Sequence, residues 1–152
     1  MIFRFYERYV RWTDRGASVG NATLHVGDLD EALRGFLTSG DGGIFLHARA
    51  LKHVYDKRPA QECDACLSHL SETATIPDLV YEDQRGKRGN YCFVKKLEGD
   101  QYLCVLERVG IALEVVTFFV IREEKYLARR KLLWSREDGS TLHRHAPGVG
   151  YY

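Results

Sequence analysis

Four polar side chains are the candidates for chemistry in this chain: His53, Arg58, Lys95 and Thr117. Cleavage of RNA by its own 2′-hydroxyl needs a base, an acid for the leaving oxygen, and cations for the phosphorane charge. Imidazole exchanges protons near neutral pH, so we expect His53 to act as general acid/base. Arg58 and Lys95 would stabilise the phosphate charge and Thr117 would orient it, provided that the fold brings all four together.

Each of these residue types also has an ordinary structural interpretation. His53 fits the surface or core of a helix, and Thr117 is a good strand residue. Lys95 and Lys96 are neighbours on a predicted strand, so their side chains point to opposite faces of the sheet. Because Cys92 and Val94 have the pattern of buried residues, we expect Lys95, on the other face, to line the open side.

Further basic and aromatic residues are candidates for contacts to a nucleic acid backbone and its bases. These candidates are Lys57, Arg85, Lys87, Arg88, Lys125, Tyr126 and Arg129. Arg85, Lys87 and Arg88 lie in a predicted loop that contains glycines, and a loop of this kind suits contact with RNA. The later group follows Glu123 and Glu124, and it equally fits the solvated side of a helix.

Cys63 and Cys66 form a C-x-x-C pattern with His69 three residues further on. A zinc site would need a fourth ligand, which His47 or His53 could supply. The usual zinc knuckle is a tight turn, however, and Leu67 and Leu70 point to a buried helix face. We therefore expect no bound metal and no cofactor, with zinc kept as the alternative.

The chain has 152 residues and a formal net charge of +1. This length suits one domain, 1–152, and the balanced charge does not itself require a nucleic acid partner. We expect reduced cysteines, a cytoplasmic location and no membrane association, because the sequence shows neither a secretory pattern nor an apolar span. It also lacks the sequence motifs of P-loop nucleotidases, dinucleotide oxidoreductases, serine hydrolases and zincins.

The hydrophobic pattern predicts helices first and then a meander of strands. Predicted helices are 28–39, 44–56, 59–71 and 123–134, and predicted strands are 79–83, 90–97, 101–108 and 113–121, with a brief strand at 22–26. Segment 3–12 suits either a helix or an edge strand, and 135–152 has the composition of a tail. The expected fold is α+β, with N-terminal helices on a four-stranded antiparallel sheet and a C-terminal helix and tail.

The order of these parts resembles the phage-borne branch of the barnase, EndoU, colicin and RelE-like nuclease superfamily. The resemblance covers about 44–130 and rests on short segments, namely Lys52-His53-Val54, Ile76-Pro77-Asp78-Leu79-Val80, Phe93-Val94-Lys95-Lys96, Tyr102 to Glu107 and Val115 to Phe119. It implies metal-independent RNA cleavage on the sheet, with His53, a strand lysine at 95 or 96, and Thr117 in the site. Where such families carry a second histidine or basic residue, this chain has Lys57-Arg58.

Two hypotheses follow. The first is an endoribonuclease-like domain, a phage or toxin effector whose partners are RNA and a cognate inhibitor or other protein. The second is a catalytically inactive module that binds RNA or protein on the same scaffold, as a phage-encoded interaction or inhibitor protein would. The absence of a second histidine next to Lys57-Arg58 favours the second, whereas the basic segments suit both.

Overall fold

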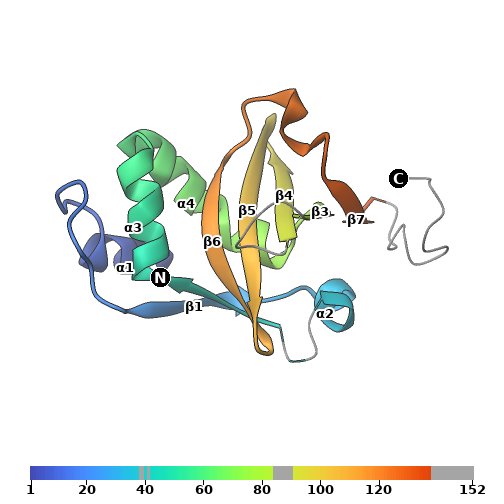
Figure 1. Ribbon diagram of the computed structural model, residues 1–152, viewed down its shortest axis with the longest axis horizontal. Coiled ribbons are helices and arrows are strands. Elements are labelled where there is room, and N and C mark those ends of the chain that lie inside the picture. Colours follow the sequence, from blue (N-terminus) through green and yellow to red (C-terminus); the bar gives the residue numbers. More distant parts are fainter. Residues whose placement is uncertain (38–39, 41, 84–90, 138–152) are drawn as a thin grey trace.

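One mixed sheet with helices packed against it forms the fold in a computed structural model that describes residues 1–37, 40, 42–83 and 91–137 (Figure 1). The helices are α1 (Ile2–Tyr9), α2 (Glu31–Leu37), α3 (Ala48–Lys57) and α4 (Ala60–Thr75), and η1 (Glu124–Leu127) is a 3₁₀ turn. The strands are β1 (Thr23–Asp28), β2 (Gly43–His47), β3 (Leu79–Glu82), β4 (Tyr91–Leu97), β5 (Asp100–Val109), β6 (Ala112–Val120) and β7 (Lys131–Ser135).

The seven strands of the described chain are ordered β1-β2-β6-β5-β4-β3-β7, and β2 with β6 is the parallel pair. The hairpin between β4 and β5 closes through Glu98 and Gly99, both with positive φ, at 52° and 86°. Such backbone angles are those of the tight turns whose twist matches paired strands. The predicted meander of β4, β5 and β6 is therefore confirmed.

A large core lies between the sheet and helices α1, α3 and α4. α4 turns Cys63, Leu67, Leu70 and Ala74 inward, a helical spacing that places all four on one buried face. Helix α3 runs alongside β6 and packs against it (Figure 1). Strand β6 therefore pairs with the short strand β2 at Leu113 and Glu114 and is also packed by helix α3.

The opposite face of the sheet carries a second, smaller core, in which Cys92, Val94, Leu103 and Val105 are buried. Residues of η1 pack against this core. Both faces of β4 are therefore covered, and its residues Tyr91–Val94 are all buried. The prediction that Lys95 lines an open face of the sheet therefore fails at β4, because hydrophobic residues cover both faces of this strand.

The prediction of a four-stranded antiparallel sheet is wrong, because the sheet has seven strands and one parallel pair. Part of the error is local: the sequence predicts that a helix begins at residue 44, but residues 44–47 belong to β2. In that strand Ile44 and Leu46 are buried while Phe45 and His47 are half-buried, the alternation of a strand. Five residues are too few to separate this period from that of the helix that follows directly.

The prediction of a C-terminal helix at 123–134 is also wrong. The helix is reduced to the single turn η1, and Lys131–Ser135 forms strand β7, which pairs with β3. Good helix formers are overruled here because β3 would otherwise leave its outer backbone groups unpaired. The tail from residue 138 onward lies outside the described residues. Segment 3–12, left open above between helix and edge strand, is helical up to Tyr9, as part of α1 (Ile2–Tyr9).

No helix among the described residues is long and apolar enough to cross a membrane.

Candidate functional site

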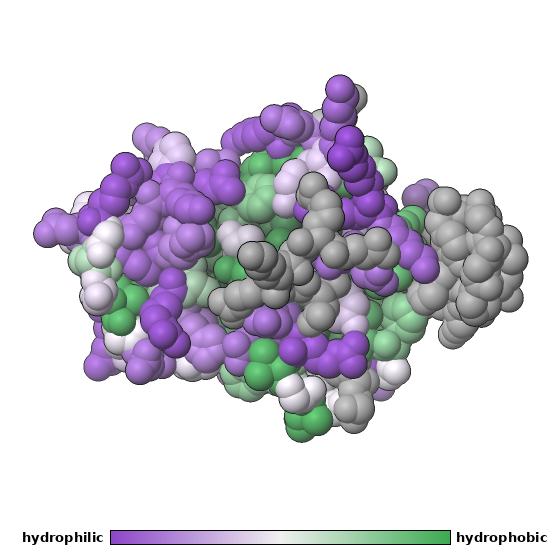
Figure 2. Space-filling model, viewed as in Figure 1, coloured by the Kyte–Doolittle hydropathy of each residue, from purple (hydrophilic) through white to green (hydrophobic). Residues whose placement is uncertain are grey.

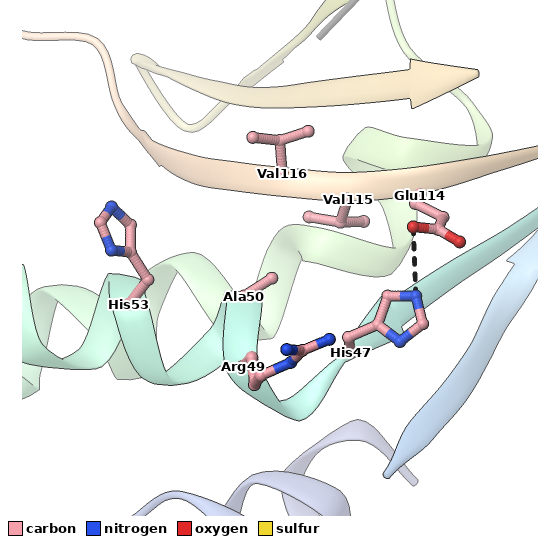
Figure 3. Close-up of a pocket in the computed structure, with 7 residues that line it drawn as sticks. All are labelled: His47, Arg49, Ala50, His53, Glu114, Val115 and Val116. Carbon is pink, nitrogen blue, oxygen red and sulfur yellow. Dashed lines mark ion pairs between the residues drawn. The ribbon is translucent and has the colours of Figure 1, made fainter. Parts of the chain in front are cut away.

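A cleft of about 520 Å³ lies between helix α3 and strand β6. Its lining residues are His47, Arg49, Ala50, His53, Glu114, Val115 and Val116. Figure 3 shows the valines of β6 and Ala50 of α3 between two histidines, with Arg49 extended toward His47. The cleft therefore has an apolar floor and polar groups that can exchange protons or bind an anion.

His47 is held from two sides at the point where β2 ends and α3 begins. Its Nδ1 atom lies 2.8 Å from Thr23 Oγ1, and its Nε2 atom lies 3.2 Å from Glu114 Oε1. Strand pairing sets this geometry, since Thr23 is directly opposite His47 and Glu114 lies on the parallel neighbour β6. The two contacts hold the His47 ring in one orientation at the edge of the cleft.

His53 and Arg49 project from the same exposed face of α3, one turn apart. Within the described part of the chain neither side chain makes a hydrogen bond or an ion pair. The imidazole of His53 and the guanidinium of Arg49 are therefore available to a ligand. An arginine fork matches the geometry of phosphate oxygens, and Figure 3 shows the Arg49 side chain extended toward His47.

Lys95 and Thr117 do not line this cleft. The Lys95 ammonium lies 3.4 Å from the Asp78 carboxylate, and its cross-strand neighbour is Tyr102, which belongs to the large core. Thr117 is opposite Val105, on the face of the smaller core, and next to the lining residue Val116. The structure therefore does not bring Lys95 to His53, and it leaves Thr117 one residue beyond the cleft.

Arg58 also lies outside the cleft. Its guanidinium carbon is 4.6 Å from the centre of the Phe119 ring, at the far end of α3. A guanidinium over the face of an aromatic ring is a favourable arrangement for arginine. Arg58 thus lies over a ring of β6 instead of lining the cleft with His53.

The remaining predicted contacts to nucleic acid fall into three groups. Lys57, Lys125 and Arg129 are exposed. Tyr126 packs edge-on against Phe119, with the ring centres 5.3 Å apart. Residues 85, 87 and 88 lie outside the described residues.

The cysteine pattern lies in the core instead of at a surface site. Cys63 and Cys66 are buried, and His69 packs against the Tyr102 ring at 4.6 Å. Burial raises the pKa of Cys63, and it raises the pKa of Cys66 to about 12 with Glu62 nearby as a further cause. Among the described residues no three His, Cys, Asp or Glu side chains are grouped closely enough to hold a metal ion.

The sequence pattern alone missed Thr23, Arg49 and Glu114 as site residues and assigned His47 only to the zinc alternative. A signal for Glu114 exists, since a carboxylate between Leu113 and Val115 interrupts a buried apolar strand. The parallel contact of β2 with β6, which brings Glu114 to His47, has no comparable local signal.

No known family of proteins, no curated protein and no solved structure matches this chain.

Proposed function

We propose that the chain is a metal-independent endoribonuclease that cleaves RNA by attack of the ribose 2′-hydroxyl. The observation that carries this proposal is the cleft of about 520 Å³ that joins two histidines, a carboxylate and an arginine without a hydrogen bond or ion pair to any residue that the structure describes. Two groups that exchange protons near neutral pH and one cation are the minimum set for this reaction.

In the proposed reaction His53 accepts the proton of the 2′-hydroxyl, and the oxygen attacks the adjacent phosphorus. The bond from phosphorus to the 5′-oxygen breaks, and that oxygen takes the Nδ1 proton of His47, which leaves its contact with Thr23 to donate it. Glu114, 3.2 Å from His47, stabilises the imidazolium before the transfer. Arg49 stabilises the charge of the phosphorane. The products are a 2′,3′-cyclic phosphate and a free 5′-hydroxyl, so no water and no metal takes part in this step.

This assignment keeps His53 from the sequence prediction. The other proposed site residues are His47, Arg49 and Glu114, and the predicted residues Arg58, Lys95 and Thr117 have no catalytic role in it. We further propose a cytoplasmic location, consistent with four free buried cysteines. An RNA-cleaving protein endangers its own cell, so a cognate inhibitor and a role as a phage or toxin effector belong to the same proposal. The relationship to the barnase, EndoU, colicin and RelE-like superfamily is likewise proposed.

The test is cleavage of single-stranded RNA in the presence of a chelator, with the chemical nature of the new ends determined. We expect 2′,3′-cyclic phosphates from the wild type and a loss of about 10²- to 10⁴-fold for His53→Ala. His25→Ala is the matched control, because this exposed histidine pairs with Asp28 at 2.9 Å and does not line the cleft. Equal cleavage by wild type and His53→Ala would reject the proposal.

A second candidate function is a module that binds RNA without cleaving it. The observation favouring it is that Thr23 and Glu114 already contact both ring nitrogens of His47. An imidazole so engaged must release one partner before it can serve a substrate. Salt-sensitive binding of RNA with no turnover at high enzyme concentration would support this alternative.

A further inference from the structure

The exposed face of α3 carries a line of cationic and proton-exchanging side chains: Arg49, His53 and Lys57. These residues follow one another at intervals of four, so they rise along the helix in steps of about 6 Å. Residues spaced this way stand nearly above one another on one side of a helix. Like the other two, Lys57 makes no hydrogen bond or ion pair with any described residue. The line begins in the cleft and continues past it, toward the end of α3.

At that end a ladder of cations and aromatic rings crosses from α3 to η1. The guanidinium of Arg58 lies over the Phe119 ring at 4.6 Å, Phe119 meets Tyr126 edge-on at 5.3 Å, and Arg130 lies over Tyr126 at 4.3 Å. Arg58 makes no hydrogen bond or ion pair inside the described ranges. A guanidinium fixed on one face by a ring can receive a nucleobase on its other face.

The surface between these two features is apolar at its base. Figure 2 shows green surface bordered by the hydrophilic surface of α3, at the place where Figure 1 shows β6. Val116 and Phe119 are half-buried residues of β6 that pack against the smaller core. The cationic side chains of α3 beside this apolar surface complement a single-stranded nucleic acid, which has phosphates on one side and bases on the other.

We propose that the groove between α3 and β6 binds the single-stranded RNA that flanks the scissile phosphate. The scissile phosphate contacts Arg49 with the attacking 2′-hydroxyl next to His53, a neighbouring phosphate contacts Lys57, and a base stacks on the Arg58 guanidinium where it lies over Phe119. This inference rests on the proposed function, because the cleft fixes where the strand is cut. Duplex RNA does not fit, since its bases are already stacked on one another and their faces cannot reach Arg58.

The experiment measures binding instead of cleavage, with wild-type protein and a fluorescent 2′-O-methyl RNA that lacks the attacking hydroxyl. We expect Arg58→Lys to weaken binding of the single strand about tenfold, since charge is kept and the stacking plane is lost. Lys57→Gln should weaken binding and lower the slope of log K against log salt by about 0.7, the value for one phosphate contact. Arg4→Gln is the control, because this exposed arginine lies on α1, away from the groove.

Phe119→Leu, which removes the ring beneath Arg58 and keeps an apolar side chain, should weaken binding as Arg58→Lys does. Wild-type affinity in Arg58→Lys, or duplex binding as tight as binding of the single strand, would overturn the groove assignment. This failure differs from failure of the proposed function. If Lys57→Gln and Arg58→Lys bind and cut RNA like the wild type, the groove assignment is rejected and the proposed catalysis stands. If the binding results are as expected but no variant and no wild-type protein cuts RNA, the proposed catalysis is rejected and the groove assignment stands.

Discussion

The two histidines of the cleft differ in how firmly the protein holds them. His47 is fixed by Thr23 at 2.8 Å and Glu114 at 3.2 Å, whereas His53 extends from α3 without a partner among the described residues. Glu114 keeps the His47 ring in one orientation while Nδ1 exchanges Thr23 for the leaving oxygen, and a free ring adapts to its substrate. We therefore assign proton donation to the fixed ring and proton uptake to the free one.

Thr23→Val tests the positioning of His47. Loss of the hydroxyl removes the contact to Nδ1 and lets the ring rotate away from Glu114, so we expect RNA cleavage to fall about tenfold. The exposed position of Thr23 predicts a change in stability within about 0.5 kcal/mol.

The measurement is the pH profile of kcat together with a thermal melt. A purely structural role would lower the melting temperature and leave the profile unchanged, whereas a positioning role shifts the limb that reports the acid. Thr23→Ser should restore both the profile and the rate. A wild-type profile in Thr23→Val would contradict the role given to His47.

Helix α3 presents the cleft residues on one side and is anchored on the other. The Lys52 ammonium is buried and contacts Thr13 Oγ1, the Asp14 carbonyl oxygen and Asp56 Oδ1, at 2.8, 2.6 and 2.8 Å. The backbone N–H of Gly16 donates to Asp56 at 3.0 Å. These bonds fasten the loop after α1 to the helix and fix the helix against rotation.

Asp56→Asn tests this anchor through its dependence on pH. Partial burial raises the pKa of Asp56, but hydrogen bonds from Lys52 and Gly16 outweigh it and hold the pKa below the ordinary value of 3.8. A carboxylate with a lowered folded pKa adds stability above pH 3.8 and loses it as the pH falls through the folded value.

We expect the Asp56→Asn variant to lose about 1 kcal/mol of unfolding free energy at neutral pH and almost none in acid. Urea titrations at several pH values measure this, with Asp28→Asn as the control, because Asp28 is half exposed and its pair with His25 is at the surface. An equal loss at every pH would contradict the assignment to the charged form.

Helices and strands with clear local sequence signals could be predicted. Very short strands, and strands that form against the local helix propensity, could not. Pro59 as a first-turn residue predicted the start of α4, although the helix runs on to Thr75 past the predicted end at 71, and alternation with turns predicted β4, β5 and β6. Strand β2 was hidden by the helix that follows it, and β7 is made by pairing with β3 against local helix propensity. His53 could be singled out by its residue type and does line the cleft, but Glu114 reaches His47 only through a contact distant in sequence.

On the scale of the whole molecule, two hydrophobic cores lie on opposite faces of one sheet. Cys66 and Cys104 belong to the large core and Cys92 to the smaller one, and all three are buried. Burial raises the pKa values of Cys66 and Cys104, so both thiols stay protonated and unreactive at neutral pH.

Thiol labelling therefore reports unfolding of the whole molecule. We expect a thiol reagent to modify the native protein slowly, at a rate limited by opening of the structure, and to modify all four cysteines quickly in denaturant. Mass spectrometry of the labelled protein over time gives the rate for each cysteine. Rapid modification of Cys66 in native buffer would show that α4 opens independently of the sheet.

The parallel contact of β2 with β6 also has a consequence for biosynthesis. Ile44 pairs with Leu113, and Phe45 with Glu114, so both walls of the cleft meet across a long stretch of chain. While the ribosome adds residues from the N-terminus onward, His47 and His53 are made well before Glu114. The nascent polypeptide therefore stays without a complete cleft until β6 has emerged, so under the proposed function the RNA that directs its synthesis is not exposed to a finished site before then.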